Sequence, residues 1–180
     1  VSIGGGKTLS GAIGVTAGSI KLTDTGTLAS TVEMSGGTTL DADNSLTVSG
    51  ALTQSGDITI DVAETSTLTY TGTPISLGEF TLALTGGGNL LSGGLDLNNA
   101  NSKLLLSSIT VDRVSTSVDN SLGVEVLSDS TVTSFSLSEK LRLSVASEKT
   151  LRITEPLIIP TAGMELAGSG QLELTDNLTM

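Results

Sequence analysis

Short alternations of apolar and polar residues recur along the chain. In the segment DITIDV, residues 57–62, the apolar side chains Ile58, Ile60 and Val62 fall on one face and the polar ones on the other. This period of two is typical of a half-buried β-strand. The same pattern predicts strands at 80–84, 123–126, 141–145, 151–153, 164–166 and 172–174.

The spacing of these alternations indicates how the strands are arranged. Apolar pairs recur roughly every six to eight residues, which is closer than in an antiparallel sandwich. Three of them make a turn of about 18–24 residues, the size of one unit of a solenoid. With coils about 4.8 Å apart, the chain forms a rod about 35–40 Å long. We therefore predict an all-β fold, a right-handed parallel β-helix of about eight coils.

The composition fits a narrow aliphatic interior. Histidine, cysteine and tryptophan are absent, and the only aromatic residues are Tyr70, Phe80 and Phe135. The core must therefore be filled by smaller aliphatic side chains. The abundance of Ser and Thr disfavours helices and suits strands and turns.

We expect residues 1–180 to form a single solenoid domain. Glycines concentrate before residue 95, which predicts a change in coil shape near residues 95–103. A boundary between two domains near residue 100, in the loop 98–101, is the alternative.

Neither end of the sequence shows a capping helix or a polar capping repeat. A solenoid without caps exposes strand edges at both ends. We predict that these edges stack end to end on copies of the same chain or on adjoining solenoid segments. The predicted edges consist of Val1, Ser2, Ile3, Leu178, Thr179 and Met180. The alternative explanation is that the sequence, which starts at Val1 without an initiator Met, is a segment of a longer solenoid.

The net charge of −11 makes some partners unfavourable. It disfavours nucleic acids and anionic membrane surfaces, which both attract basic proteins. No stretch is apolar enough over a sufficient length to span a bilayer. Without cysteine the chain has neither disulfides nor a thiolate metal site.

The sequence Gly6-Lys7-Thr8 is similar to the end of a phosphate-binding P-loop. The first glycine of that motif is replaced by Val1, and no helix is predicted after it. We interpret the segment as a glycine corner before a strand.

Asp41 and Asp43 are the best candidates for a cation site, because carboxylates two apart in a strand point the same way. The segment lacks the glycine and the glutamate of an EF-hand. We interpret it as a solvated turn and predict no metal and no cofactor.

Catalysis would rest on carboxylates, Lys or Tyr70, because histidine and cysteine are absent. Lys140, Arg142, Lys149 and Arg152 cluster in sequence, but no acidic partner is obvious one coil beyond Arg142, near residue 162. We predict no enzyme. A carbohydrate-active β-helix enzyme, a polysaccharide lyase or hydrolase, is the alternative.

Threonines alternate from Thr65 to Thr73. A flat threonine lattice could bind ice or another surface, which is the second alternative. It would require Thr-x-Thr pairs in neighbouring coils. The pairs Thr23/Thr25 and Thr131/Thr133 exist, but the sequence does not show such a pair in every coil.

The stretch LDADNSLTVSGALTQSGDITIDVAETSTLTY, residues 40–70, resembles the passenger regions of bacterial autotransporter and filamentous adhesins in its polarity pattern, its Ser, Thr, Gly and Asn content and its lack of Cys. The resemblance implies export, a β-helical fold and a role in attachment or scaffolding. It carries over no functional residue. We therefore expect an extracellular or cell-surface structural rod, part of a filament, stalk or adhesin. We also keep a glycan or another surface ligand as a candidate partner.

Overall fold

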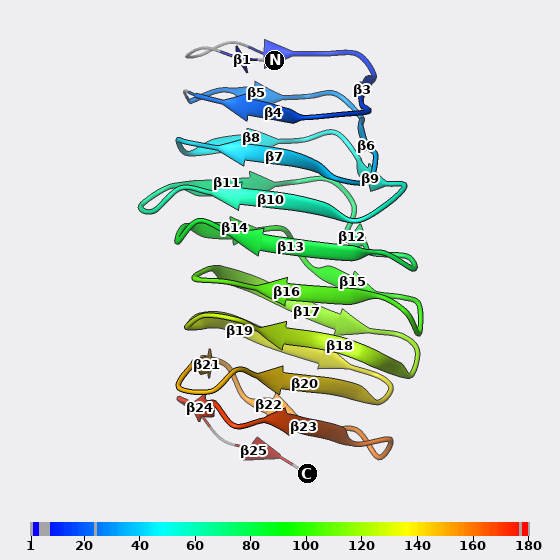
Figure 1. The fold of residues 1–180 in the computed structure, drawn as a ribbon, viewed down its shortest axis with the longest axis vertical. Coiled ribbons are helices and arrows are strands. Elements are labelled where there is room, and N and C mark those ends of the chain that lie inside the picture. The colour runs from blue at the N-terminus through cyan, green and yellow to red at the C-terminus, as the bar shows by residue number, and fades with distance from the viewer. Residues whose placement is uncertain (1, 4–7, 24, 177, 180) are drawn as a thin grey trace.

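The computed structural model describes residues 2–3, 8–23, 25–176 and 178–179. In these ranges the chain forms strands and turns and contains no helix. Neighbouring strands within each sheet pair in parallel. Figure 1 shows them stacked as the coils of a rod, with the two termini at opposite ends. The predicted parallel β-helix is confirmed.

Two long sheets make up most of the rod. Sheet A has nine strands, in the order β1 (Ser2–Ile3), β4 (Ser19–Leu22), β7 (Thr38–Ala42), β10 (Ile58–Val62), β13 (Thr81–Thr85), β16 (Lys103–Leu106), β18 (Asn120–Val126), β20 (Leu141–Val145) and β23 (Met164–Gly168). The main path of sheet B consists of β2 (Thr8–Leu9), β5 (Thr27–Leu28), β8 (Leu46–Val48), β11 (Thr67–Tyr70), β14 (Asn89–Leu91), β17 (Thr110–Thr116), β19 (Ser130–Leu137), β21 (Thr150–Ile153) and β24 (Gln171–Leu174).

The remaining strands form a shorter third side. They are β3 (Ile13–Val15), β6 (Val32–Met34), β9 (Leu52–Gln54), β12 (Ile75–Ser76), β15 (Leu95–Leu97), β22 (Leu157–Ile158) and β25 (Leu178–Thr179). Coils with three short strands, as the spacing predicted, run from β1 to β15. The next two coils differ, because β17 and β19 each continue from the sheet B side onto the third side. The cross-section therefore changes directly after β15.

The winding is right-handed. In Figure 1 the strands of sheet A lie in front and point left, those of sheet B lie behind and point right, and the chain descends from the N-terminus. Partners in sheet A lie between 19 and 24 positions apart, since Val124 pairs with Leu143 and Ile58 with Leu82. The nine strands of sheet A are thus separated by eight turns.

The interior is filled by columns of aliphatic side chains in register. One column of sheet A consists of Ile20, Leu40, Ile60, Leu84, Leu106, Val126 and Val145. Each of these side chains is at most 5% exposed. The buried residues form one hydrophobic cluster from Val15 to Leu157. Because stacking places each side chain on an equivalent one, every coil buries the apolar face of the next.

Two residues of the predicted strands lie outside them: Asp57, which directly precedes β10, and Phe80. Phe80 was placed in a strand with Leu82 and Leu84, but it lies in the turn before β13 and is only half-buried. The amide of Phe80 donates to the Leu77 carbonyl instead of a neighbouring coil. This turn lengthens the coil and moves the ring out of the column.

Candidate functional site

The predicted stacking edges lie partly within the described residues. Val1 and Met180 lie outside them. Ser2 and Ile3 form β1, the terminal strand of sheet A, which pairs only with β4 in that sheet. Leu178 and Thr179 form β25, which pairs with β22. One edge of each strand therefore has no partner among the described strands, and their stacking remains a prediction.

The last coil exposes side chains that point into the core in other coils. Leu166 continues the column of Leu143, which is fully buried, yet Leu166 is 62% exposed. Met164, Leu172 and Leu174 are only partly buried. No described coil lies beyond them. This end of the rod therefore presents an apolar surface lined by core positions.

The predicted cation candidate is bridged by a lysine. Lys21, one coil earlier, places its Nζ 3.1 Å from Asp41 Oδ2 and 2.9 Å from Asp43 Oδ2. The hydrogen bonds to Asp43 and then to Asp41 raise the pKa of the Lys21 ammonium above its usual value. The ammonium occupies the position that a cation would need. Among the described residues, no group of three or more metal-binding side chains converges.

The basic residues of the second half lie on two different faces. Lys140 and Arg142 approach Glu165 on the sheet A side, at 3.2 and 3.7 Å. Arg152 pairs with Glu173 on sheet B at 3.1 Å. The expectation that Arg142 lacks an acidic partner is wrong, because this coil is longer than assumed and places Glu165 beside it. These exposed pairs add little to stability.

An open groove of about 870 Å³ follows the turns between sheets A and B. Its lining includes three carboxylates, Glu64, Asp129 and Glu173, together with Arg152. The Asp129 carboxylate accepts a hydrogen bond from the Thr150 amide at 2.8 Å, and Glu173 is paired with Arg152. Sequence reasoning missed this groove, because its residues come from separate coils.

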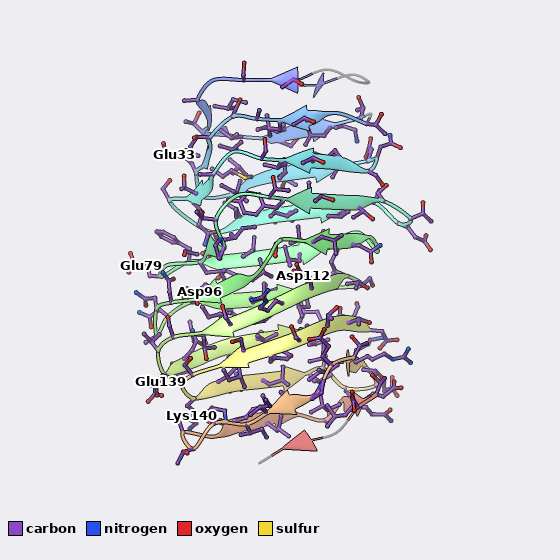
Figure 2. All side chains as sticks on the ribbon, turned by 180° about the vertical axis from the view of Figure 1, so that it is seen from behind. Glu33, Glu79, Asp96, Asp112, Glu139 and Lys140 are labelled. Atoms are coloured by element: carbon purple, nitrogen blue, oxygen red, sulfur yellow. The ribbon has the colours of Figure 1, made fainter. Side chains whose placement is uncertain are left out.

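Acidic residues on the opposite side of the rod are spread along its length. Figure 2 labels Glu33, Glu79, Asp96 and Glu139 in different coils, without a common point of convergence. Asp112 is structural, because its carboxylate accepts hydrogen bonds from the Ser92 amide and hydroxyl and the Gly93 and Arg113 amides. On this side of the rod, the negative charge is therefore distributed along the surface.

The middle of the threonine run lies on the outer face of sheet B, whereas Thr65 lies in the turn before β11 and Thr73 in a bend after it. Thr67 and Thr69 belong to β11, and their neighbours in the preceding coil are Ser45 and Thr47. Thr25 and Thr27 lie one coil before these. The sequence analysis missed Thr27 and Thr47, although a Ser/Thr-x-Thr pattern repeated after 20 and 22 residues would have revealed them.

No family model, no curated protein and no solved structure matches this chain. Within the described ranges there is no helix with the length and apolar character needed to cross a bilayer.

Proposed function

We propose that the protein is an extracellular structural rod, forming part of a bacterial surface filament, stalk or adhesin. The observation that supports this best is the continuous column of buried aliphatic side chains from Ile20 to Val145, which persists across the register shift between β18 and β20. Such a core gives every coil the same support from its neighbours. A rod of this kind holds whatever lies at one end at a fixed distance from the other.

The direction of the hydrogen bonds suits a mechanical role. Bonds between coils run along the rod axis, for example from the Thr39 amide to the Gly18 carbonyl and from the Ala63 amide to the Ala42 carbonyl. In a parallel sheet these bonds are evenly spaced. A pull along the axis is therefore shared by the bonds of three sides in each coil.

The composition supports a location outside the cell. The chain has no cysteine, and its net charge is −11. Like charges keep neighbouring rods apart in solution. The resemblance of residues 40–70 to secreted adhesins points the same way.

Assembly end to end would extend the rod. The apolar surface at the last coil, with Leu166 62% exposed, suits a covering coil supplied by a second copy or by an adjoining solenoid segment. Stacking would remove apolar area from water and pair the open strand edges.

Negative-stain electron microscopy and light scattering over a concentration series test this assembly. We expect fibres from the unaltered chain and their loss in Leu166→Glu, because a buried unpaired carboxylate is costly. Leu91→Glu is the matched control, since Leu91 is also exposed, at 45%, but lies on the lateral face of β14. Strict monomers of the unaltered chain at high concentration would contradict self-assembly.

A carbohydrate-active enzyme is the second candidate, favoured by the groove that holds Glu64, Asp129, Glu173 and Arg152. Acid–base cleavage of a polysaccharide needs carboxylates facing one substrate. A polyuronate viscosity assay tests it. Loss of viscosity with the unaltered chain, abolished by Asp129→Asn, would favour the enzyme over the rod.

A further inference from the structure

The outer face of sheet B carries hydroxyl side chains in columns over its first four coils. The central column consists of Thr8, Thr27, Thr47 and Thr69, which pair coil to coil. A second column contains Thr25, Ser45 and Thr67, and a third contains Ser49 and Thr71. We call these nine residues the hydroxyl face.

The register makes the hydroxyl face a regular two-dimensional array. Neighbouring strands lie about 4.8 Å apart, and residues two apart in a strand about 6.6 Å. The pairing from β5 through β8 to β11 has no register shift, whereas β18 and β20 are shifted against each other at Asn120. Figure 1 shows β5, β8 and β11 stacked directly above one another.

The central hydroxyls are free to bind an external group. Within the described ranges, the hydroxyls of Thr27, Thr47 and Thr69 make no hydrogen bond to the protein. These side chains are half-buried by their neighbours in the sheet, and each has few rotamers because threonine is branched at Cβ. The hydroxyl and methyl groups are therefore held in place before a ligand arrives.

The hydroxyl face also lacks charge. No acidic or basic residue occurs in 25–29, 45–49 or 67–71. The outer face of sheet A in the same coils differs, because Lys21, Asp41 and Asp61 lie beside its threonines. A charged ligand would thus find no partner on the hydroxyl face.

We propose that the hydroxyl face binds the surface of ice. A crystal of water presents oxygen atoms on a rigid lattice that repeats every few ångström, as a regular array on a sheet does, so several fixed hydroxyls can enter the lattice at once while the methyl groups fill the spaces between them. Ordered water bridges polar groups almost as well as direct contacts do. A polysaccharide fits less well, because the hydroxyl face has no aromatic ring on which a sugar could stack.

The experiment is thermal hysteresis, the difference between the melting and freezing points of a single ice crystal, measured with the full chain. We expect hysteresis and faceted crystals with the unaltered protein, and its loss in Thr47→Lys, because a long charged side chain at the centre holds the ice surface away. Thr39→Lys is the matched control: Thr39 lies in the same coil, is also half-buried, and faces outward as the second residue of β7 on sheet A. It should retain the hysteresis.

Circular dichroism confirms that each variant is folded, and Thr69→Lys replaces Thr47→Lys if the latter is not. Absence of hysteresis in the unaltered chain overturns the proposal, as does an equal effect of the two lysine variants. Binding to insoluble cellulose or chitin without hysteresis would also overturn it, in favour of a glycan. Leu166→Glu should leave hysteresis unchanged, which separates this proposal from end-to-end assembly.

Discussion

Three consecutive leucines in β16 test the alternation on which the fold depends. Leu104 and Leu106 are fully buried in two columns of the core, whereas Leu105 lies between them on the outer face and is half-buried. Each is changed to alanine in turn. The substitutions are chemically identical and lie in one strand, so they differ only in the direction of the side chain.

The expected losses of stability follow from this burial. Truncating a fully buried leucine removes its transfer free energy and leaves a cavity, which together cost about 2–5 kcal/mol. Truncating Leu105 removes contacts on one side of an outward side chain, which costs about 1 kcal/mol or less. Dividing this loss by a urea m-value of about 1–3 kcal/mol per M lowers the unfolding midpoint of the two inner variants by about 0.7–5 M.

Urea unfolding followed by far-UV circular dichroism measures these midpoints. We expect Leu104→Ala and Leu106→Ala to unfold early and Leu105→Ala to stay near the unaltered protein. A loss in Leu105→Ala as large as in its two neighbours would refute the assigned register, because a slip of one residue exchanges the inner and outer faces.

Three further predictions concern single contacts. In Tyr70→Phe we expect a loss of about 1–3 kcal/mol in the free energy of unfolding, because the buried Leu52 amide, which donates to the Tyr70 hydroxyl at 3.0 Å, is left without a partner; urea unfolding measures it. We expect Gly123→Ala to lower the melting temperature far more than Gly93→Ala. Both glycines have φ near +66°. At Gly123 an added Cβ would lie 1.8 Å from the carbonyl oxygen of Arg142, whereas at Gly93 it would meet nothing within 4 Å. The pKa of Lys21 is raised in the folded state, so its ion pairs stabilise the fold below the unfolded pKa of about 10.4, and this stabilisation is lost as the pH rises through the folded pKa. Above pH 10 the melting temperature of Lys21→Met should therefore fall less steeply with pH than that of the unaltered protein. Equal slopes for the two proteins would contradict the assigned pairing.

The sequence determined the elements and their faces. The alternation at 57–62 predicted the inward side chains Ile58, Ile60 and Val62 correctly, and all three are buried. The segment 141–145 was also correctly predicted as a strand. These inferences succeeded because the apolar period of a strand is a local property of the chain. The average spacing of the strands gave the length of a coil for the same reason.

Only the tertiary structure decided which residues of different coils meet. Coil lengths vary from 19 to 24 residues, so a partner cannot be found by counting a fixed period. This variation explains why Glu165 was not predicted beside Arg142, and it changes the spacing within the column of Thr27, Thr47 and Thr69 from 20 to 22 residues. The turns between strands set each length, through corners such as the one at Phe80, and their geometry follows from how the whole coil closes on its neighbour.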